Sequence, residues 1–522
     1  RDVVLVEQRG TMYSTPFLQC PDMLEVKLEI MRQNLGEEEE DALRLQAWAA
    51  CREQFVASGV DLAAYNSLEN AADIVAVVDA LGYEQVNLYG GSYGSLLAQH
   101  VMRDYPERIR SAILSDVSPL RHAPNMRDKA RSMDRALRMV FAQCVADQAC
   151  SQAYPDLGAV YWDLVAQLDE APVTLQLTDP NTGQVHEMVL TGRRLVAVTR
   201  NLLYVTAVLP RLPSAINDMA EGDFSLVELL ESRFMFSLGM ADGMYNSVVC
   251  SELADFSVAD MASSEGLYPQ VSEVVEDLID EAMLQPCQLW GVDHLGDALD
   301  QSLVSDIPTL LLSGEYDPTV PPQLAEVAAE GLTNAHLYTF PATSHGILGS
   351  SECAHAILLA FLDDPTQEPD ASCLDAMPGL VFHIPPAELA LEAFVDEARG
   401  FRGLVPSGWQ ELRPANMARG SSVNDPAYFV LEAEPVSASE MLANLAGQLG
   451  FDPEAEPVAE TPLGSMTWQL YALQIEALPL DLALAEDGGK TYFVLLISPA
   501  DEHDALYEQL FLPAVEAMGP IG

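Results

Sequence analysis

The stretch that most constrains the fold is VNLYGGSYGSLLAQ, residues 86–99. It begins with an apolar run of strand length and continues into a segment of helical composition that Pro106 ends. Between the two, the residues GGSYG around Ser92 fit the pattern G-x-S-x-G, in which small neighbours let a serine adopt a strained turn and expose its hydroxyl at a sheet edge. The strand–turn–helix context therefore predicts that Ser92 is a nucleophile, and not an idle serine in a glycine-rich turn.

A serine hydroxyl needs a histidine base and a carboxylate that orients this base. Downstream, the buried run 307–314 predicts a strand, and Asp317 lies in the loop after it. Residues 336–340 predict the next strand, and His345 comes after that strand. The three side chains would then lie beyond the carboxyl ends of parallel strands, where open α/β sheets place their sites. The order Ser, Asp, His is that of α/β-hydrolases.

Other assignments of the acid and the base stay open. Asp116 belongs to the end of a predicted strand over 111–117 and would overlook the same edge of the sheet. Glu315 is close enough in the acid loop to substitute if that loop turned differently. Among the nine histidines, His100 and His355 fall on predicted helices, where packing or surface roles are expected.

The chain is predicted to consist of an interrupted α/β core and an appended domain. The first part of the core, 1–120, begins with a predicted strand over 3–6, and 121–293 is mainly helical, as expected for a lid over the site. The core resumes over 294–370, and the proline- and acid-rich run 363–370 predicts the junction. Residues 376–522 are predicted to be an α+β domain, faintly similar to small PsbP-like domains, that binds, docks or stabilises. The patterns within these parts predict a hairpin at 173–190, strands at 401–412, 427–433, 466–475, 480–485 and 491–498, and helices at 437–449 and 500–518.

The charge of the chain excludes two classes of partner. The net charge is −54, and only three of the 25 basic residues are lysines, Lys27, Lys129 and Lys490. Such a surface repels nucleic acid and anionic lipid. No apolar run reaches the length of a membrane span. The sequence leaves the oligomeric state open.

The eight cysteines occur as sequential pairs, without the spacing of a zinc site. The simplest pairing gives local disulfides; the alternative is eight reduced thiols in the core. Disulfides would place the protein in an oxidising compartment, so that a secreted or cell-envelope location is expected. The predicted pairs are Cys20–Cys51, Cys144–Cys150, Cys250–Cys287 and Cys353–Cys373.

Several separate segments resemble one family. They are DVVLVEQRGT, YNSLENAADIVAVVDALGYEQVNLYGGSYGSLLAQHVMRDYPERI, YNSVVCSE, IPTLLLSGEYDPTVPP and PATSHGI. Together they are similar, over roughly residues 1–375, to the exported tripeptidyl-aminopeptidase-like branch of the prolyl aminopeptidase family of α/β-hydrolases. The resemblance implies a serine exopeptidase for peptides with a free amino terminus, with Ser92 as nucleophile, Asp317 as orienting acid, His345 as base and no cofactor or metal.

The sequence departs from that family at its start. Family members carry further strands and a His-Gly-Gly-type loop, which supplies an oxyanion-hole amide, before the segment that begins this chain. We therefore expect a sheet without its first strands and a chain that is part of a longer polypeptide. The backbone N–H of Tyr93 is the oxyanion-hole donor that can be assigned.

An aminopeptidase must also hold the substrate ammonium, which calls for a carboxylate. Glu252, in the segment YNSVVCSE, is the first candidate and Glu7 is the second, although Glu252 could equally be an ordinary structural acid. Two other functions stay open. One is an esterase that uses the same triad, and the other is a catalytically silent hydrolase-fold binding protein.

Overall fold

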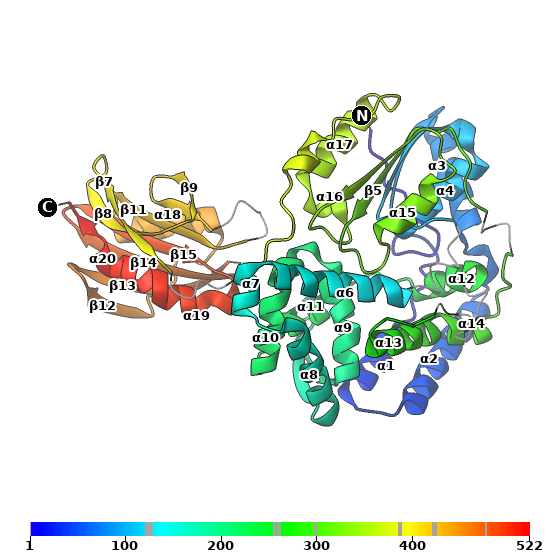
Figure 1. Cartoon of the computed structure of the whole chain (residues 1–522), viewed down its shortest axis with the longest axis horizontal. Helices are drawn as coiled ribbons and strands as arrows, with labels where there is room; N and C mark the ends of the chain where they lie inside the picture. Colours follow the sequence, from blue (N-terminus) through cyan, green and yellow to red (C-terminus); the bar gives the residue numbers. More distant parts are fainter. Residues whose placement is uncertain are drawn as a thin grey trace. The chain divides into compact units, whose positions relative to one another are not determined.

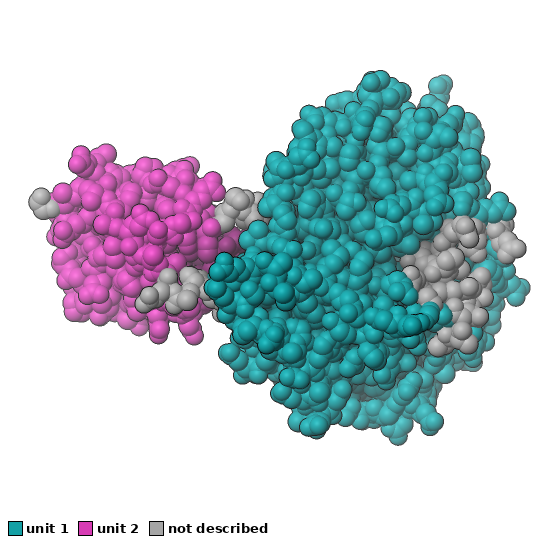
Figure 2. Space-filling view, in the orientation of Figure 1, with its two compact units in different colours: residues 1–384 teal, residues 385–522 magenta. Residues whose placement is uncertain are grey.

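The computed structural model describes residues 2–521 apart from 121–128, 254–256, 258–260, 262, 297–298, 300, 385–388, 420–424 and 476–477. The chain forms two compact units, Arg1–Ile384 and Pro385–Gly522 (Figure 2). The predicted junction, residues 363–370, and the first residues expected to belong to the appended domain lie in the first unit, where Leu380 and Phe382 are buried.

The described part of the first unit contains a sheet of four parallel strands in the order β1-β2-β5-β6. Every residue of β5 is buried, which explains why its sequence, TLLLSG, has three leucines and no charged residue. The predictions of these strands are confirmed, with ends shifted by at most two residues. Their bounds are β1 Val86–Gly91, β2 Ile109–Ser115, β5 Thr309–Gly314 and β6 Ala335–Phe340.

Helices cover both faces of this sheet (Figure 1). Side chains alternate along a strand, so Leu311 packs in the core below α3, α4 and α15, while Leu310 and Leu312 pack in the core below α16 and α17. Asn66 caps α3 and Gly82, with φ +76°, ends it, as predicted. The helices are α3 Ser67–Leu81, α4 Tyr93–Asp104, α15 Pro322–Ala329, α16 Ile347–Ser350 and α17 Glu352–Asp363.

The predicted strand at residues 3–6 is wrong. This segment is irregular, and the side chains of Val3 and Leu5 are 84% and 92% exposed. A strand needs a neighbour for its backbone N–H and C=O groups, and within the described residues no strand pairs with this segment. Its apolar composition alone therefore does not make it part of the sheet.

The segment between β2 and β5 is mainly helical, as predicted for the lid, and its helices gather in a body beside the sheet (Figure 1). It includes the predicted hairpin, whose turn has Gly183 at φ +73°. In the part of the chain that the structure describes, no helix is both long and apolar enough to cross a membrane. The lid elements are α6 Lys129–Ala146, α7 Gln148–Ala153, α8 Leu157–Glu170, β3 Val173–Thr178, β4 Val185–Leu190, α9 Gly192–Tyr204, α10 Leu212–Glu221, α11 Ser225–Met235, α12 Asp242–Glu252, α13 Pro269–Ile279 and α14 Gln285–Trp290.

All eight cysteines are paired, and each pair is the predicted one. Cys20–Cys51 joins the start of α1 (Pro21–Arg32) to α2 (Glu37–Ala57). Cys250–Cys287 ties α12 to α14. Disulfides persist in oxidising compartments, so the pairing indicates a location outside the cytosol.

The second unit contains an antiparallel sheet with helices on both faces. Within its described residues the strand order is β12-β13-β14-β15-β11-β10-β9, and a smaller sheet has the order β16-β8-β7. α18 (Ala438–Leu449) covers one face, with Ser437 as its N-cap, and the C-terminal helical segment 503–517 covers the other. The predicted strand at 401–412 is two strands, because a turn at 407–409 divides it. The strands are β7 Leu391–Asp396, β8 Phe401–Pro406, β9 Gln410–Arg413, β10 Asn416–Ala418, β11 Tyr428–Glu434, β12 Ala459–Leu463, β13 Met466–Ile475, β14 Leu478–Asp487, β15 Lys490–Ile497 and β16 Gly519–Pro520.

Candidate active site

Ser92 occupies the sharp turn between β1 and α4. Its φ is +55° and its ψ is −123°, a conformation that is strained for a residue with a side chain. Its N–H donates to the Ser115 carbonyl at 3.0 Å, which anchors the turn to β2. A Cβ atom on Gly90 would lie 2.0 Å from the Gly94 carbonyl oxygen, so the turn can close only with glycine at position 90. The local geometry is that of a nucleophile elbow.

The backbone N–H of Tyr93 lies at the first position of α4. The first N–H groups of a helix have no partner within the helix and carry the positive end of its dipole. This N–H is therefore available to an oxygen that develops negative charge beside Ser92. The Tyr93 phenol points elsewhere, because its hydroxyl lies 2.9 Å from Ser67 Oγ.

Asp317 and His345 meet at the ends of β5 and β6. His345 Nδ1 lies 2.7 Å from Asp317 Oδ2, and the two side chains are 7% and 0% exposed. Asp317 Oδ1 accepts the backbone N–H groups of Thr319 at 2.7 Å and Val320 at 2.9 Å. The carboxylate is thus fixed from both sides, and its second oxygen is directed at the imidazole. This is the arrangement of an acid that orients a histidine base.

The two alternative acids bind elsewhere. Glu315 Oε2 accepts the N–H of Ala342, and Asp116 accepts the Gly346 N–H and the Ser115 hydroxyl. Asp116 is still a neighbour of the pair. One carboxylate oxygen of Asp116, one of Asp317 and one ring nitrogen of His345 all lie within 4.8 Å of one another. These atoms are close enough to share a cation, but each acid oxygen that they offer already accepts a hydrogen bond within the protein.

The structure brings Ser92, which follows β1, to the same edge of the sheet as His345, which follows β6. Ser92 is bound to Ser115, and the neighbouring Asp116 is bound to Gly346, the residue after the histidine. Within the described residues no hydrogen bond joins Ser92 Oγ to His345 Nε2. Ser92 is half-buried.

Two cations of the lid hold the acid loop. Arg135 of α6 donates to the carbonyl oxygens of Glu315 at 2.9 Å and Asp317 at 3.1 Å. Lys129, at the start of α6, donates to the Thr319 carbonyl at 2.9 Å. Burial lowers the pKa of Lys129 to about 8, although Asp317 opposes the shift. Sequence reasoning missed both residues, yet Lys129 is one of three lysines in the chain, and that rarity was a usable signal.

Residues of the lid also contact the loop that carries His345. Tyr204, the last residue of α9, stacks on the His345 ring with centroids 4.2 Å apart and planes inclined by 23°. Ser344 donates its N–H to Thr206 Oγ1 at 2.9 Å and its hydroxyl to the Leu203 carbonyl at 2.6 Å. The imidazole therefore lies between Asp317, which binds its edge, and an aromatic ring that covers its face. No local sequence pattern indicated Tyr204.

Glu252 and Glu7, the candidates for the substrate ammonium, differ strongly in environment. Glu252 is 3% exposed, and its two oxygens accept the backbone N–H and the hydroxyl of Ser67, at the first turn of α3. Burial raises the pKa of Glu252 to about 7. Glu7 is exposed, and it accepts the Thr11 hydroxyl at 2.7 Å and the Tyr13 N–H at 3.2 Å. The ammonium-binding role of either residue stays a prediction.

Comparisons with known proteins found two matching family models and related serine proteases. The family model "alpha/beta hydrolase fold" matches residues 1–160, and the family model "TAP-like protein" matches residues 272–373. Serine protease Hip1 of Mycobacterium tuberculosis, and the same protein of Mycobacterium bovis, are 23% identical to the chain over 414 residues, which are 71% of this chain and 74% of the relative.

Solved structures with similarity to the chain include two hydrolases. One is MGS-M2, an alpha/beta hydrolase enzyme from a Medee basin deep-sea metagenome library, with a TM-score of 0.28, 16% identity and coverage of 58% of this chain and 73% of that one. The other is the esterase EaEST from Exiguobacterium antarcticum, with a TM-score of 0.27, 13% identity and coverage of 59% and 76%. Similarities at this level support no conclusion about activity.

The parallel sheet, the serine elbow after β1 and the matching family model define an α/β-hydrolase. The second family model matches the segment that carries Asp317 and His345, and the similar relative is a serine protease. Both findings point to one group within the α/β-hydrolases. The chain has the α/β-hydrolase fold and is similar to the TAP-like family of serine hydrolases.

Proposed function

We propose that the protein is a serine peptidase that removes short peptides or single residues from the free amino terminus of peptide substrates. The observation that carries the proposal is the 2.7 Å contact between His345 Nδ1 and the fully buried carboxylate of Asp317, at the sheet edge where Ser92 forms a strained elbow. The similarity to a serine protease supports peptides as the substrate class.

In the proposed mechanism His345 Nε2 takes the proton of the Ser92 hydroxyl as Oγ attacks the substrate carbonyl carbon. Asp317 accepts the Nδ1–H bond, so it selects the tautomer with a free Nε2 and stabilises the imidazolium that forms. The Tyr93 N–H donates to the developing oxyanion. His345 then protonates the leaving amine, and a water molecule, deprotonated by the same imidazole, hydrolyses the ester at Ser92.

The test of the proposal compares peptide reporters with a free and with an acetylated amino terminus. An aminopeptidase should cleave the free reporter and hardly cleave the acetylated one, because its site must hold an ammonium group. An esterase with the same triad would cleave simple esters and neither peptide. Equal cleavage of both peptides would indicate an endopeptidase and overturn the proposed specificity.

The pH dependence of kcat/KM should report the titration of His345. Burial lowers the pKa of His345, but the hydrogen bond and the charge of Asp317 more than offset this, so the pKa lies above its ordinary value of 6.5. The base must be neutral, so kcat/KM should rise with pH through a midpoint above 6.5. The charge of Asp116 also raises this pKa, so Asp116→Asn should move the midpoint down. A midpoint at or below 6.5 in the unmodified protein would contradict the assignment.

We propose Glu252 as the carboxylate that holds the substrate ammonium, with Glu7 as the second candidate. The proposal is supported by the link from Glu252 through Ser67 to the side chain of Tyr93, the residue after the nucleophile. A bound ammonium would also favour the ionised form of this buried acid.

Glu252→Gln should raise KM for peptides with a free amino terminus about tenfold, the effect of losing one charge-assisted hydrogen bond. Hydrolysis of amino-blocked esters should change little. Glu7→Gln, measured in the same way, tests the second candidate. Equal losses on both kinds of substrate would make Glu252 a structural acid that caps α3 and remove it from the substrate site.

We also propose that the protein works outside the cytosol, secreted or in the cell envelope. The support is the four disulfides, which are typical of oxidising compartments.

A further inference from the structure

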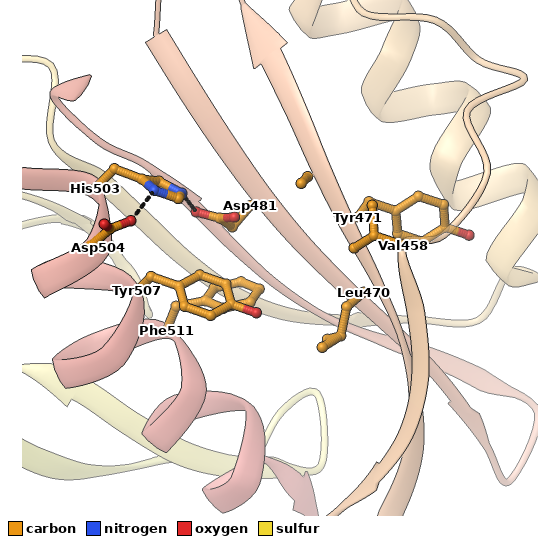
Figure 3. Close-up of a pocket in the computed structure, with 9 residues that line it drawn as sticks. Val458, Leu470, Tyr471, Asp481, His503, Asp504, Tyr507 and Phe511 are labelled. Carbon is orange, nitrogen blue, oxygen red and sulfur yellow. Dashed lines mark hydrogen bonds and ion pairs between the residues drawn. The ribbon is translucent and has the colours of Figure 1, made fainter.

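The second unit contains a pocket that the proposed peptidase mechanism does not use. It has a volume of about 230 Å³ and is lined by residues of β13 and β14, the residue before β12 and the helical segment 503–511 (Figure 3). It lies on the sheet face that the C-terminal helical segment covers, because Leu470 and Phe511, which line it, belong to the core of that face. The pocket is built within one unit.

One side of the pocket carries two carboxylates and one imidazole. Asp481 Oδ2 lies 2.9 Å from His503 Nε2, and Asp504 Oδ1 lies 3.1 Å from His503 Nδ1 (Figure 3). None of the lining residues is a lysine or an arginine, so one imidazole is the only basic side chain among the residues that line the pocket with the two carboxylates.

Asp481 is the feature that points to a ligand. It is 2% exposed and lines the pocket, and its hydrogen bond to His503 uses Oδ2. Among the described residues Oδ1 has no protein donor, so it can accept a hydrogen bond from a molecule in the pocket. The two acids bind opposite nitrogens of the ring, so they do not converge on one point as the ligands of a metal ion do.

The helical segment that carries His503 also supplies two aromatic rings to the pocket. Tyr507 and Phe511 stack with their ring centroids 5.2 Å apart. Burial raises the pKa of Tyr507, and the charge of Asp481 adds to this shift. A carboxylate in a pocket that also has aromatic rings attracts cations with an apolar stem, by ion pairing and by cation–π attraction.

We propose that this pocket binds a small organic cation, a primary ammonium or a guanidinium on an apolar stem, with the cationic head on Asp481 and the stem against Tyr507. The ligand is either a free molecule or the side chain of a lysine or an arginine in a peptide; the chemistry that recognises both is the same.

The test is titration calorimetry on the full chain with n-butylguanidinium, n-butylammonium and the uncharged n-pentanol. The cations should bind with dissociation constants in the millimolar range or below, and pentanol should bind at least about tenfold more weakly. N-acetyl-lysine amide and a tripeptide with a central lysine then distinguish a free ligand from a peptide side chain. If no cation binds, or if pentanol binds as well as the cations, the proposal is wrong.

Asp481→Asn should weaken cation binding about tenfold or more. Asp487→Asn is the matched control, because it removes the same charge from an exposed position six residues along β14, roughly 20 Å away. Equal affinities in the two variants would overturn the proposal. Thermal unfolding checks that Asp481→Asn folds. If it does not, Tyr507→Leu at the half-buried wall keeps the stem contact, removes the aromatic face and should still weaken cation binding about threefold.

Discussion

Ser92→Ala is expected to lower kcat on any substrate of the protein by about 10⁶-fold. The alcohol is the only group of the protein that bonds to the acyl carbon in the proposed mechanism, and its loss leaves the binding site and the Tyr93 N–H without the protein's nucleophile. Alanine tolerates the φ of +55° as poorly as serine does, so the variant should fold like the original protein. Hydrolysis rates, a fluorophosphonate label and a thermal unfolding curve measure the three parts of this expectation.

Ser95→Ala is the matched control for that experiment. Ser95 lies one turn along α4, and its hydroxyl donates to the Ser92 carbonyl at 2.6 Å and accepts the Ser118 N–H at 2.9 Å. Its loss should loosen the elbow and reduce the rate moderately, but the label should still attach. If the full-length protein with Ser92 takes no label, or if labelling survives in Ser92→Ala, Ser92 is not the nucleophile, and a silent binding protein becomes the better description.

Asp317→Asn is expected to lower kcat about 10⁴-fold. The amide oxygen should stay on the N–H groups of Thr319 and Val320, because these need an acceptor, and the amide NH2 would then face His345. An NH2 group donates where the carboxylate accepted, so it favours the tautomer with the proton on Nε2. That imidazole cannot take the proton of Ser92. Steady-state kinetics with a matched unfolding curve measures the loss.

Two neighbouring acids serve as controls for Asp317. Asp116→Asn removes a nearby charge without touching a ring nitrogen, and Glu315→Gln keeps an acceptor for the Ala342 N–H. We expect losses of about tenfold or less for the first and little change for the second. A loss in Asp116→Asn as large as in Asp317→Asn would mean that the orienting acid is Asp116, the alternative that sequence left open.

Features that depend on a few adjacent residues were predictable. The elbow needs glycine at position 90, where Gly94 approaches closely, and helix α3 needs Asn66 and Gly82 at its ends; each requirement is visible in a short window of sequence. The disulfides were also predictable, because the paired cysteines are near neighbours in the chain, 6 to 37 residues apart.

Features that depend on partners far along the chain were not predictable. The apolar run at 3–6 has the composition of a strand, but strand formation is decided by a neighbour that accepts and donates its hydrogen bonds, and composition does not show whether one is present. Tyr204 likewise lies 141 positions before His345 in the chain, and only folding brings the centroids of the two rings to 4.2 Å from each other.

The sequence by itself therefore determined the class of fold, the strained serine and the order of the three side chains proposed for the chemistry, because these depend on backbone sterics and on the apolar pattern of single segments. Only the tertiary structure decided that Asp317, and not Asp116 or Glu315, contacts the imidazole, and that the lid holds both loops through Arg135, Lys129 and Tyr204. The physical reason is the short distance over which these contacts act. A hydrogen bond or a ring stack acts over a few ångströms, and the fold alone sets which distant residues come that close.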